Sequence, residues 1–231
     1  MWRAKLVYEW IRQLYADPNM ARMGHAQSIE DQNLGSGWIY YGLARALRPS
    51  TVVVIGSFRG FVPLVLGKAL QDNGRGDVVF IDPSLVDDFW LSPPRVRRHF
   101  KNYGITNVRH YCCTTQEFVT TEGYRSLDEI GLLFVDGYHT EEQAQFDFAA
   151  FEPKLRSDAL VLFHDSVRER QSSIYGENRA YTHSVCRFME SLRLDPAFQV
   201  LSLGLGDGLT VVSRAQHHPD PRQVLIEATR R

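Results

Sequence analysis

Four titratable side chains follow two short apolar runs of the sequence, at the point where each run ends. Asp136 and His139 come after the run GLLFV, and His164 and Asp165 come after the run ALVLF. Such runs are typical of strands buried on both faces of a parallel sheet. The carboxyl ends of parallel strands meet at one edge, where ligands bind. We therefore expect the four side chains to converge in one crevice, where they could hold a metal ion or accept a proton.

Two earlier turns have the composition of a nucleoside site. The run TVVVI is followed by Gly56-Ser57-Phe58-Arg59-Gly60, whose glycines allow a tight turn and close approach to a ligand. The run DVVFI is followed by Asp82, placed where a carboxylate can accept two hydrogen bonds from a ribose. The dinucleotide fingerprint G-x-G-x-x-G is absent, because no glycine stands at position 58.

The elements that must position these residues alternate along the chain. The last two apolar runs, 198–203 and 209–213, are joined by a turn too short for a parallel crossover, so they predict an antiparallel hairpin. The pattern predicts an α/β fold: a doubly wound, Rossmann-like, seven-stranded sheet, mostly parallel, with an antiparallel C-terminal hairpin strand. The other expected strands are 51–55, 77–81, 108–112, 131–135 and 159–163. The expected helices are 3–16, 37–47, 61–71, 93–103, a short one at 124–129, one opening at Thr140, and 180–193.

We divide the chain into three parts. Residues 1–50 form an N-terminal helical segment that serves as a substrate lid or a dimer contact, residues 51–214 form the core, and residues 215–231 form a C-terminal tail.

Composition excludes several classes of protein. The net charge of −1 supplies no global basic field for a nucleic acid, and the basic stretch 95–101 reads as a solvated helix face. No apolar run approaches the roughly 20 residues of a membrane helix, and the charged N-terminus does not resemble a signal peptide. Three cysteines, of which the adjacent pair Cys112 and Cys113 is expected to be buried with the third strand, make no disulfide framework. We expect a cytoplasmic protein without nucleic-acid or membrane partners; a homodimer stays open.

The motifs VVVIGSFRGF, FIDPS, TTQEF, FVDGYHT and LFHDS occur in this order from about residue 52 onward. Together they resemble the class I S-adenosylmethionine-dependent methyltransferases. The chain is most similar to small-molecule O-methyltransferases related to catechol O-methyltransferase and to the macrocin and antibiotic-sugar enzymes.

The resemblance implies a role for each matching residue. It places the glycine turn beside the methionine end of S-adenosylmethionine, Asp82 on the ribose, and Thr115 with Gln116 beside the adenine. It places Asp136 near the sulfonium and makes it a metal ligand. It also makes His139 the general base and implies a second pair of metal ligands after strand 159–163. The implied cofactor residues are therefore Gly56, Ser57, Phe58, Gly60, Asp82, Thr115, Gln116 and Asp136; the implied metal ligands are Asp136, His164 and Asp165.

Two positions depart from the family pattern. The family carries an acid two residues before the first glycine, where it contacts the amino group of the cofactor; here that residue is Val54. The second pair of metal ligands is either His164-Asp165 or Asp165-Ser166, depending on how the chain is aligned with the family pattern. Mg²⁺ prefers oxygen ligands, whereas a histidine favours Mn, Fe, Ni or Zn. The sequence therefore leaves open whether the protein uses Mg²⁺, another divalent ion or none.

The expected function is methyl transfer from S-adenosylmethionine to a hydroxyl of a sugar, phenol or natural product, with or without a divalent metal. Aromatic residues outside the core fold are candidates for the acceptor wall, namely Trp38, Tyr40 and Tyr41, and Tyr175 and Tyr181 with His183. Two alternatives remain at this point: a catalytically inactive nucleoside-binding module, and an NAD-dependent oxidoreductase on a similar sheet.

Overall fold

The structure, a computed structural model, describes residues 2–215, with side chains from residue 7 onward. From residue 216 on, the predicted C-terminal tail lies outside the described residues. Within residues 2–215 there is no helix that is both long and apolar enough to cross a membrane.

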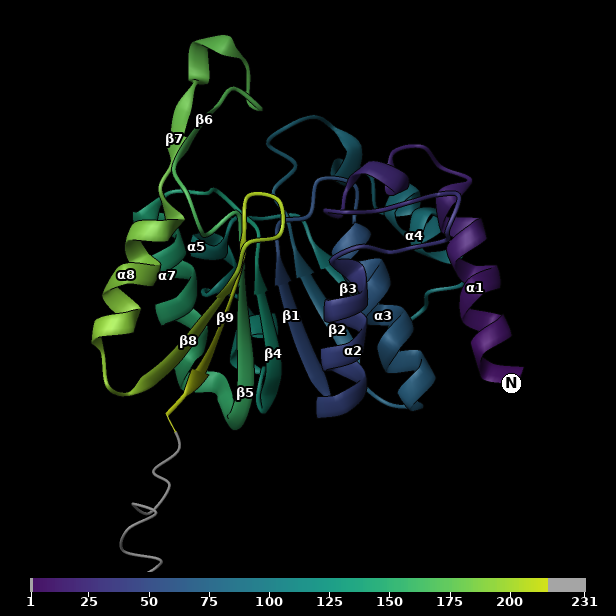
Figure 1. Ribbon diagram of the computed structural model, residues 1–231, viewed down its shortest axis with the longest axis horizontal. Helices are drawn as coiled ribbons and strands as arrows, with labels where there is room; N and C mark the ends of the chain where they lie inside the picture. The colour runs from purple at the N-terminus through teal and green to yellow at the C-terminus, as the bar shows by residue number, and fades with distance from the viewer. Residues whose placement is uncertain (1, 216–231) are drawn as a thin grey trace, which may run out of the picture.

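The core is a seven-stranded sheet with the order β3-β2-β1-β4-β5-β9-β8 (Figure 1). Neighbours among β1 to β5 are parallel, and β9 runs antiparallel to both β5 and β8. The predicted fold class is thereby confirmed. The strands are β1 (Thr51–Ile55), β2 (Asp77–Ile81), β3 (Val108–Tyr111), β4 (Ile130–Val135), β5 (Leu155–His164), β8 (Phe198–Leu203) and β9 (Leu209–Arg214). The strand order reverses between β1 and β4, which creates a crevice at their carboxyl ends.

Helices cover both faces of this sheet (Figure 1). Side chains of β1 point alternately to the two sides, so Val52 and Val54 pack in one apolar cluster while Val53 and Ile55 pack in the other. One face carries α1 (Trp2–Tyr15), α2 (Gly37–Leu47), α3 (Phe61–Asn73) and α4 (Pro93–Asn102). The other carries α5 (Thr115–Phe118), α6 (Glu122–Arg125), α7 (Glu141–Phe151) and α8 (Val185–Leu194). Burial on both faces explains why the central strands are continuous apolar runs.

The segment 166–183 differs from its prediction. A helix was expected from residue 180, but β6 (Arg170–Ser172) and β7 (Tyr181–His183) pair as an antiparallel hairpin, and α8 begins only at Val185. The hairpin projects above the carboxyl edge of the main sheet (Figure 1). Three-residue strands are stable here because of their pairing and packing, which local propensity does not report.

Two smaller expectations about the stretch after β3 are also wrong. The strand ends at Tyr111, so Cys112 is exposed and Cys113 half-buried. The short helix expected at 124–129 is replaced by α5 and α6, each beginning after a threonine whose hydroxyl caps it: Thr114 accepts from the Glu117 amide and Thr121 from the Tyr124 amide.

Candidate active site

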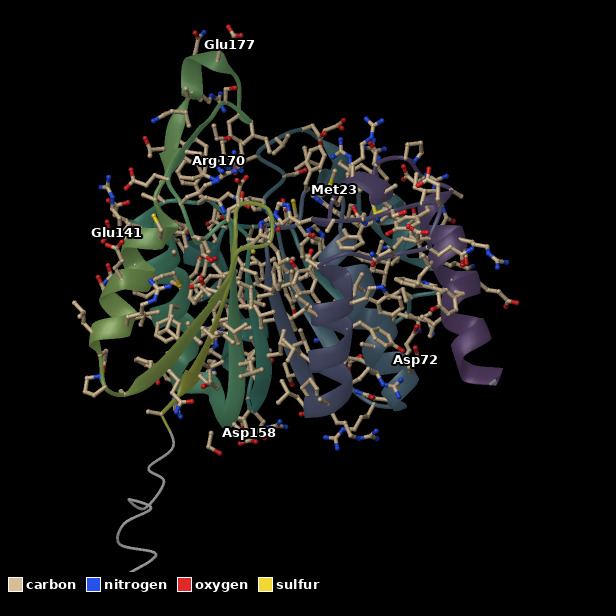
Figure 2. The ribbon with its side chains drawn as sticks, viewed as in Figure 1. Met23, Asp72, Glu141, Asp158, Arg170 and Glu177 are labelled. Atoms are coloured by element: carbon tan, nitrogen blue, oxygen red, sulfur yellow. The ribbon has the colours of Figure 1, made fainter. Side chains whose placement is uncertain are left out.

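A cavity of about 780 Å³ opens at the carboxyl edge of the sheet, between the ends of β1, β2, β4 and β5 and the β6–β7 hairpin. Met23 from the segment between α1 and α2 and Arg170 from the hairpin both lie at this edge (Figure 2). Every residue predicted to bind the cofactor or a metal or to act in catalysis lines the cavity except Gly60, which is the N-cap of α3. The structure therefore brings the two groups of predicted residues, those of the nucleoside turns and those after β4 and β5, into one space.

The glycine turn after β1 is shaped by a close approach to β4. Gly56 has a φ of 70°, and a Cβ at this position would lie 2.2 Å from the carbonyl oxygen of Asp136. Only glycine tolerates both conditions. The turn then exposes the amide of Ser57, which donates to Oδ2 of Asp82 at 3.2 Å. Val54 is fully buried in the core and offers nothing to the cavity.

Asp82 is a buried carboxylate held by backbone amides. Ser57 donates to one oxygen, and the amide of Ser84 donates to the other at 2.7 Å. Burial raises the pKa of Asp82 to about 6, against the lowering effect of these two hydrogen bonds. Each oxygen keeps acceptor capacity toward the cavity, which is what a pair of ribose hydroxyls requires.

The residues expected beside an adenine adjoin a carboxylate that sequence reasoning missed. Gln116 donates to the side chain of Gln143 at 2.8 Å, and Gln143 donates in turn to Oδ1 of Asp147 at 2.8 Å. Asp147 is buried, burial raises its pKa to about 6, and its Oδ2 has no hydrogen-bond partner. One signal was available: this acid stands among the buried positions of α7, next to Phe148.

On the other side of the cavity lies a group that we call the histidine cluster: His25, His139, His164, His183, Asp136 and Asp165. The Nδ1 atom of His164 lies 2.8 Å from Oδ1 of Asp136 and 3.3 Å from Oδ1 of Asp165. His139 places Nε2 3.6 Å from Oδ1 of Asp136. These three distances join the predicted residues after β4 to those after β5.

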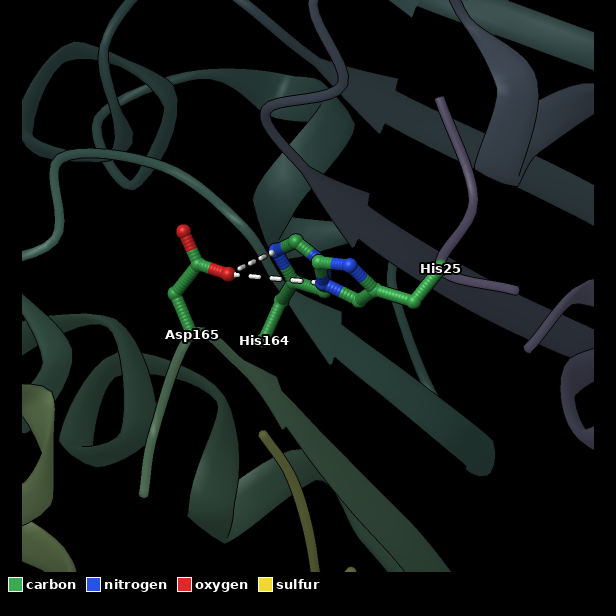
Figure 3. A group of neighbouring side chains, drawn as sticks. All are labelled: His25, His164 and Asp165. Atoms are coloured by element: carbon green, nitrogen blue, oxygen red, sulfur yellow. Dashed lines mark ion pairs between the residues drawn. The ribbon is translucent and has the colours of Figure 1, made fainter. Parts of the chain in front are cut away.

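The other two histidines approach Asp165 from outside the core motifs. Nε2 of His25 lies 3.7 Å from Oδ1 of Asp165, with its ring stacked on that of His164 (Figure 3). Nδ1 of His183 lies 3.4 Å from Oδ2 of Asp165. Arg170 donates to the same Oδ2 at 2.5 Å. His183 had been placed only in the acceptor wall, and neither His25 nor Arg170 belonged to any motif.

Charge and burial set the protonation of the cluster in opposite directions. Burial lowers the pKa of His139 to about 4, against the carboxylates around it, so its ring is neutral at physiological pH. Burial by itself lowers the pKa of His164, but the negative charges of Asp136 and Asp165 outweigh it and raise this pKa to about 9. Burial would raise the pKa of Asp165, but the neighbouring histidines hold it far below its usual range.

The donor atoms of the cluster fit a divalent cation. Several of them are buried and have no hydrogen-bond partner, including Nδ1 of His164, Nε2 of His25 and Oδ1 of Asp165. Buried polar atoms are normally satisfied, and a cation among them would satisfy all three. Imidazole nitrogens together with carboxylate oxygens are common ligands of first-row transition ions.

Part of the predicted acceptor wall lies elsewhere. Tyr40 is fully buried in the core against Phe134, and Tyr41 donates to Asp72 on α3. Tyr40 thus packs between α2 and the sheet, Tyr41 joins α2 to α3, and neither residue lines the cavity. Tyr175 and Tyr181 do line the cavity.

Known proteins resemble this chain in the region that contains the site. A family model described as a methyltransferase domain matches residues 53–166, the stretch from β1 to just beyond β5. A protein of Sinorhizobium fredii described as uncharacterised is 27% identical over 157 residues, which are 61% of this chain but only 16% of that relative's length. A putative caffeoyl-CoA O-methyltransferase of Arabidopsis thaliana is 22% identical over 192 residues, covering 74% of this chain and 72% of the relative.

Solved structures share the fold. The O-methyltransferase from Bacillus cereus, determined with S-adenosylhomocysteine, superposes with a TM-score of 0.60 over 90% of each chain, at 16% sequence identity. At this identity the likeness establishes the arrangement of strands and helices.

Proposed function

We propose that this chain, a class I S-adenosylmethionine-dependent methyltransferase, transfers the methyl group to a hydroxyl oxygen of a small molecule. One observation carries the proposal: a nucleoside-type carboxylate, Asp82, and a neutral buried histidine, His139, line the same cavity. A cofactor held by Asp82 would thus share one space with a proton acceptor, as methyl transfer to a hydroxyl requires.

The cofactor would lie along the carboxyl ends of β1, β2 and β3. Asp82 would accept from the ribose hydroxyls, Thr115 and Gln116 would lie beside the adenine, and Gly56, Ser57 and Phe58 would face the methionine end. Asp136 follows β4 and is the member of the histidine cluster that adjoins the glycine turn, so the sulfonium would sit next to a carboxylate. This arrangement points the methyl group toward the cluster.

The acceptor would be activated by His139. A hydroxyl attacks poorly while it is protonated, and a neutral imidazole can take that proton in the transition state. The residues Asp136, His164 and Asp165 would hold a divalent cation, which when bound lowers the pKa of an oxygen placed beside it. His139 lies 3.6 Å from Asp136, so the base and the metal ligands share one side of the cavity.

The acceptor wall is aromatic. The rings of Tyr138 and Tyr181 stack at 4.4 Å between centroids, and Tyr175 stacks on Tyr138 at 5.4 Å. The exposed apolar side chains of Leu85 and Ile174 line the same cavity. These surfaces favour an acceptor with a flat apolar face, such as a phenol or a polyketide, over a bare sugar.

The test combines binding with transfer. Calorimetry should show binding of S-adenosylhomocysteine and none of NAD, and radiolabelled S-adenosylmethionine should label one or more hydroxylated acceptors in a panel of phenols, polyketides and sugars. Binding without transfer to any acceptor would favour the inactive nucleoside-binding alternative. Binding of NAD alone would overturn the proposal.

A further inference from the structure

We propose that the histidine cluster contains a two-histidine, one-carboxylate metal site formed by His25, His164 and Asp165, and that this site takes a first-row transition ion in preference to Mg²⁺. The inference deepens the proposed function, because the ion would lie beside the methyl acceptor. Binding of the ion itself does not depend on methyl transfer and can be measured without it.

The spacing of the three donor atoms fits one ion. A ligand atom of each of the three residues lies within 4.8 Å of the other two. Oδ1 of Asp165 is 3.3 Å from Nδ1 of His164 and 3.7 Å from Nε2 of His25. Ligands bound at about 2.0–2.2 Å lie roughly 2.8–3.6 Å from their neighbours around a tetrahedral or octahedral ion. The first distance falls within this range, and the second exceeds it by about 0.1 Å, a shift that a small rotation of the His25 side chain would remove.

These atoms have no hydrogen bond of good geometry, although Nδ1 of His164 also lies 2.8 Å from Oδ1 of Asp136. Nε2 of His25, Nδ1 of His164 and Oδ1 of Asp165 are each buried without a hydrogen bond, and the side chain of Asp165 is only 5% exposed. Figure 3 shows both ring nitrogens directed at the one carboxylate oxygen. Buried polar atoms are normally paired, and a cation contacted by all three would pair them at once.

The fold holds His25 in this position. The backbone carbonyl of His25 accepts from the Ser36 amide at 2.9 Å, which ties the residue to the start of α2. Its ring lies between the ring of His164, 4.9 Å away, and the β8–β9 turn, where Gly206 has a φ of 61°. A Cβ on Gly206 would lie 2.1 Å from Nδ1 of His25. The glycine thus leaves room for the imidazole against the turn.

Neighbouring residues orient the carboxylate. Arg170 and His183 both face Oδ2 of Asp165, at 2.5 and 3.4 Å, which leaves Oδ1 for the ion. Such outer partners are common around metal ligands and strengthen binding. Asp136 is not one of these outer partners: its Oδ1 lies 2.8 Å from Nδ1 of His164, so it would be a further ligand of the same ion.

The donor set determines the class of ion. Mg²⁺ demands oxygen ligands and keeps several waters, whereas imidazole suits Mn²⁺, Fe²⁺, Co²⁺, Ni²⁺ and Zn²⁺. With two of three protein donors being nitrogen, a transition ion is favoured. Three protein ligands, or four with Asp136, leave positions of an octahedral ion for water or for an acceptor oxygen.

The experiment titrates metal-depleted full-length protein with Co²⁺, Zn²⁺, Mn²⁺ and Mg²⁺ in separate calorimetric runs, and follows Co²⁺ by its visible absorption. We expect one equivalent of Co²⁺ or Zn²⁺ to bind at least about 100-fold more tightly than Mg²⁺. His25→Ala should weaken Co²⁺ binding by at least the roughly 10–100-fold that loss of an outer partner costs, and should change the Co²⁺ spectrum. Gly206→Ala should act in the same direction without removing a donor.

The control is Cys112→Ser, which removes an exposed thiol outside the cluster and should leave Co²⁺ binding unchanged. Transition ions binding no more tightly than Mg²⁺, or unaltered Co²⁺ binding in His25→Ala, would overturn the inference. S-adenosylhomocysteine binding and thermal unfolding are measured on the same samples. If the protein binds S-adenosylhomocysteine but no metal, this inference alone is overturned. If the folded protein does not bind S-adenosylhomocysteine, the result counts against the proposed function.

Discussion

The cofactor side and the histidine cluster of the same cavity satisfy their polar atoms in different ways. In the cofactor side, backbone amides of Ser57 and Ser84 hold both oxygens of Asp82. In the cluster, buried atoms of His25, His164 and Asp165 face one another without hydrogen bonds. Backbone amides hold the first carboxylate in place, whereas side chains from separate segments make up the second group.

The two regions also differ in what sets the pKa values of their carboxylates. Burial dominates on the cofactor side and raises the pKa of Asp82 to about 6. At Asp165 in the cluster, opposite charges dominate, since the histidines hold the pKa of this carboxyl below its usual range although burial opposes this. The members of the cluster are thus coupled to one another, whereas the pKa of Asp82 is set mainly by burial and backbone amides, with a smaller contribution from the charge of Asp136.

The largest effect is expected from His139→Ala. The variant should lower kcat by about 10²–10⁴-fold, because it removes a general base, and should leave the affinity for S-adenosylhomocysteine nearly unchanged. Single-turnover transfer of labelled methyl measures the first quantity and calorimetry the second. The matched control is His110→Gln: burial also lowers the pKa of His110 to about 4, but it lies on β3 outside the cluster. An unchanged kcat in His139→Ala would remove the base assignment.

Asp82→Ala should produce the next largest effect, and on the other side of the cavity. Loss of charge-assisted hydrogen bonds to the ribose costs about 1.5–3 kcal/mol, which corresponds to a roughly 10–150-fold weaker affinity for S-adenosylhomocysteine. Calorimetry measures it. Co²⁺ binding by the same variant should stay as in the wild type, because Asp82 lies outside the cluster. If the affinities for S-adenosylhomocysteine and for Co²⁺ both fell in this variant, the two regions would be energetically coupled.

The pH dependence of cofactor binding should be smaller and should report the same carboxylate. The ionised form of Asp82 accepts the ribose hydroxyls, so affinity is full above its pKa of about 6 and is lost as pH falls through that value. At pH 5, one unit below, about a tenth of the protein is ionised, which predicts an affinity about tenfold lower than at pH 7. Asp147, whose pKa is also about 6, titrates in the same cavity. Asp82→Asn should therefore remove most of the pH dependence of cofactor affinity. If the pH profile were unchanged in that variant, the dependence would belong to another group.

The fold and the cofactor side were predictable because their determinants are local. The runs TVVVI and DVVFI are buried on both faces, and the helix expected at 37–47 has the same bounds in α2. The glycine turn and Asp82 each follow directly from a strand end, so one strand assignment placed them. The class I methyltransferase resemblance, drawn from motifs in these same loops, is confirmed by the methyltransferase domain matched at residues 53–166.

The histidine cluster was only half predictable because it joins four separate segments. His164 and Asp165 follow a strand end, but His25 stands in an irregular segment whose path depends on contacts with Ser36 and Gly206. His183 lies in a strand of three residues, β7, which is set by pairing with β6 and not by propensity. No spacing in the sequence encodes contacts of this kind.

The smallest effect is expected where the hairpin meets the cavity, at Tyr175. Its ring stacks on Tyr138 and Tyr181, at 5.4 and 5.7 Å, so it connects the hairpin to the loop that carries His139. Aromatic pairs contribute about 0.5–1.5 kcal/mol beyond area burial, and Tyr175→Ala should accordingly raise KM for the acceptor about 2–10-fold. The affinity for S-adenosylhomocysteine should change less, since the stack adjoins the cluster side. Tyr175→Phe keeps the ring and should behave as the wild type in steady-state kinetics. An equal loss in both variants would assign the effect to the hydroxyl, and no loss in either would mean that the hairpin does not form the acceptor wall.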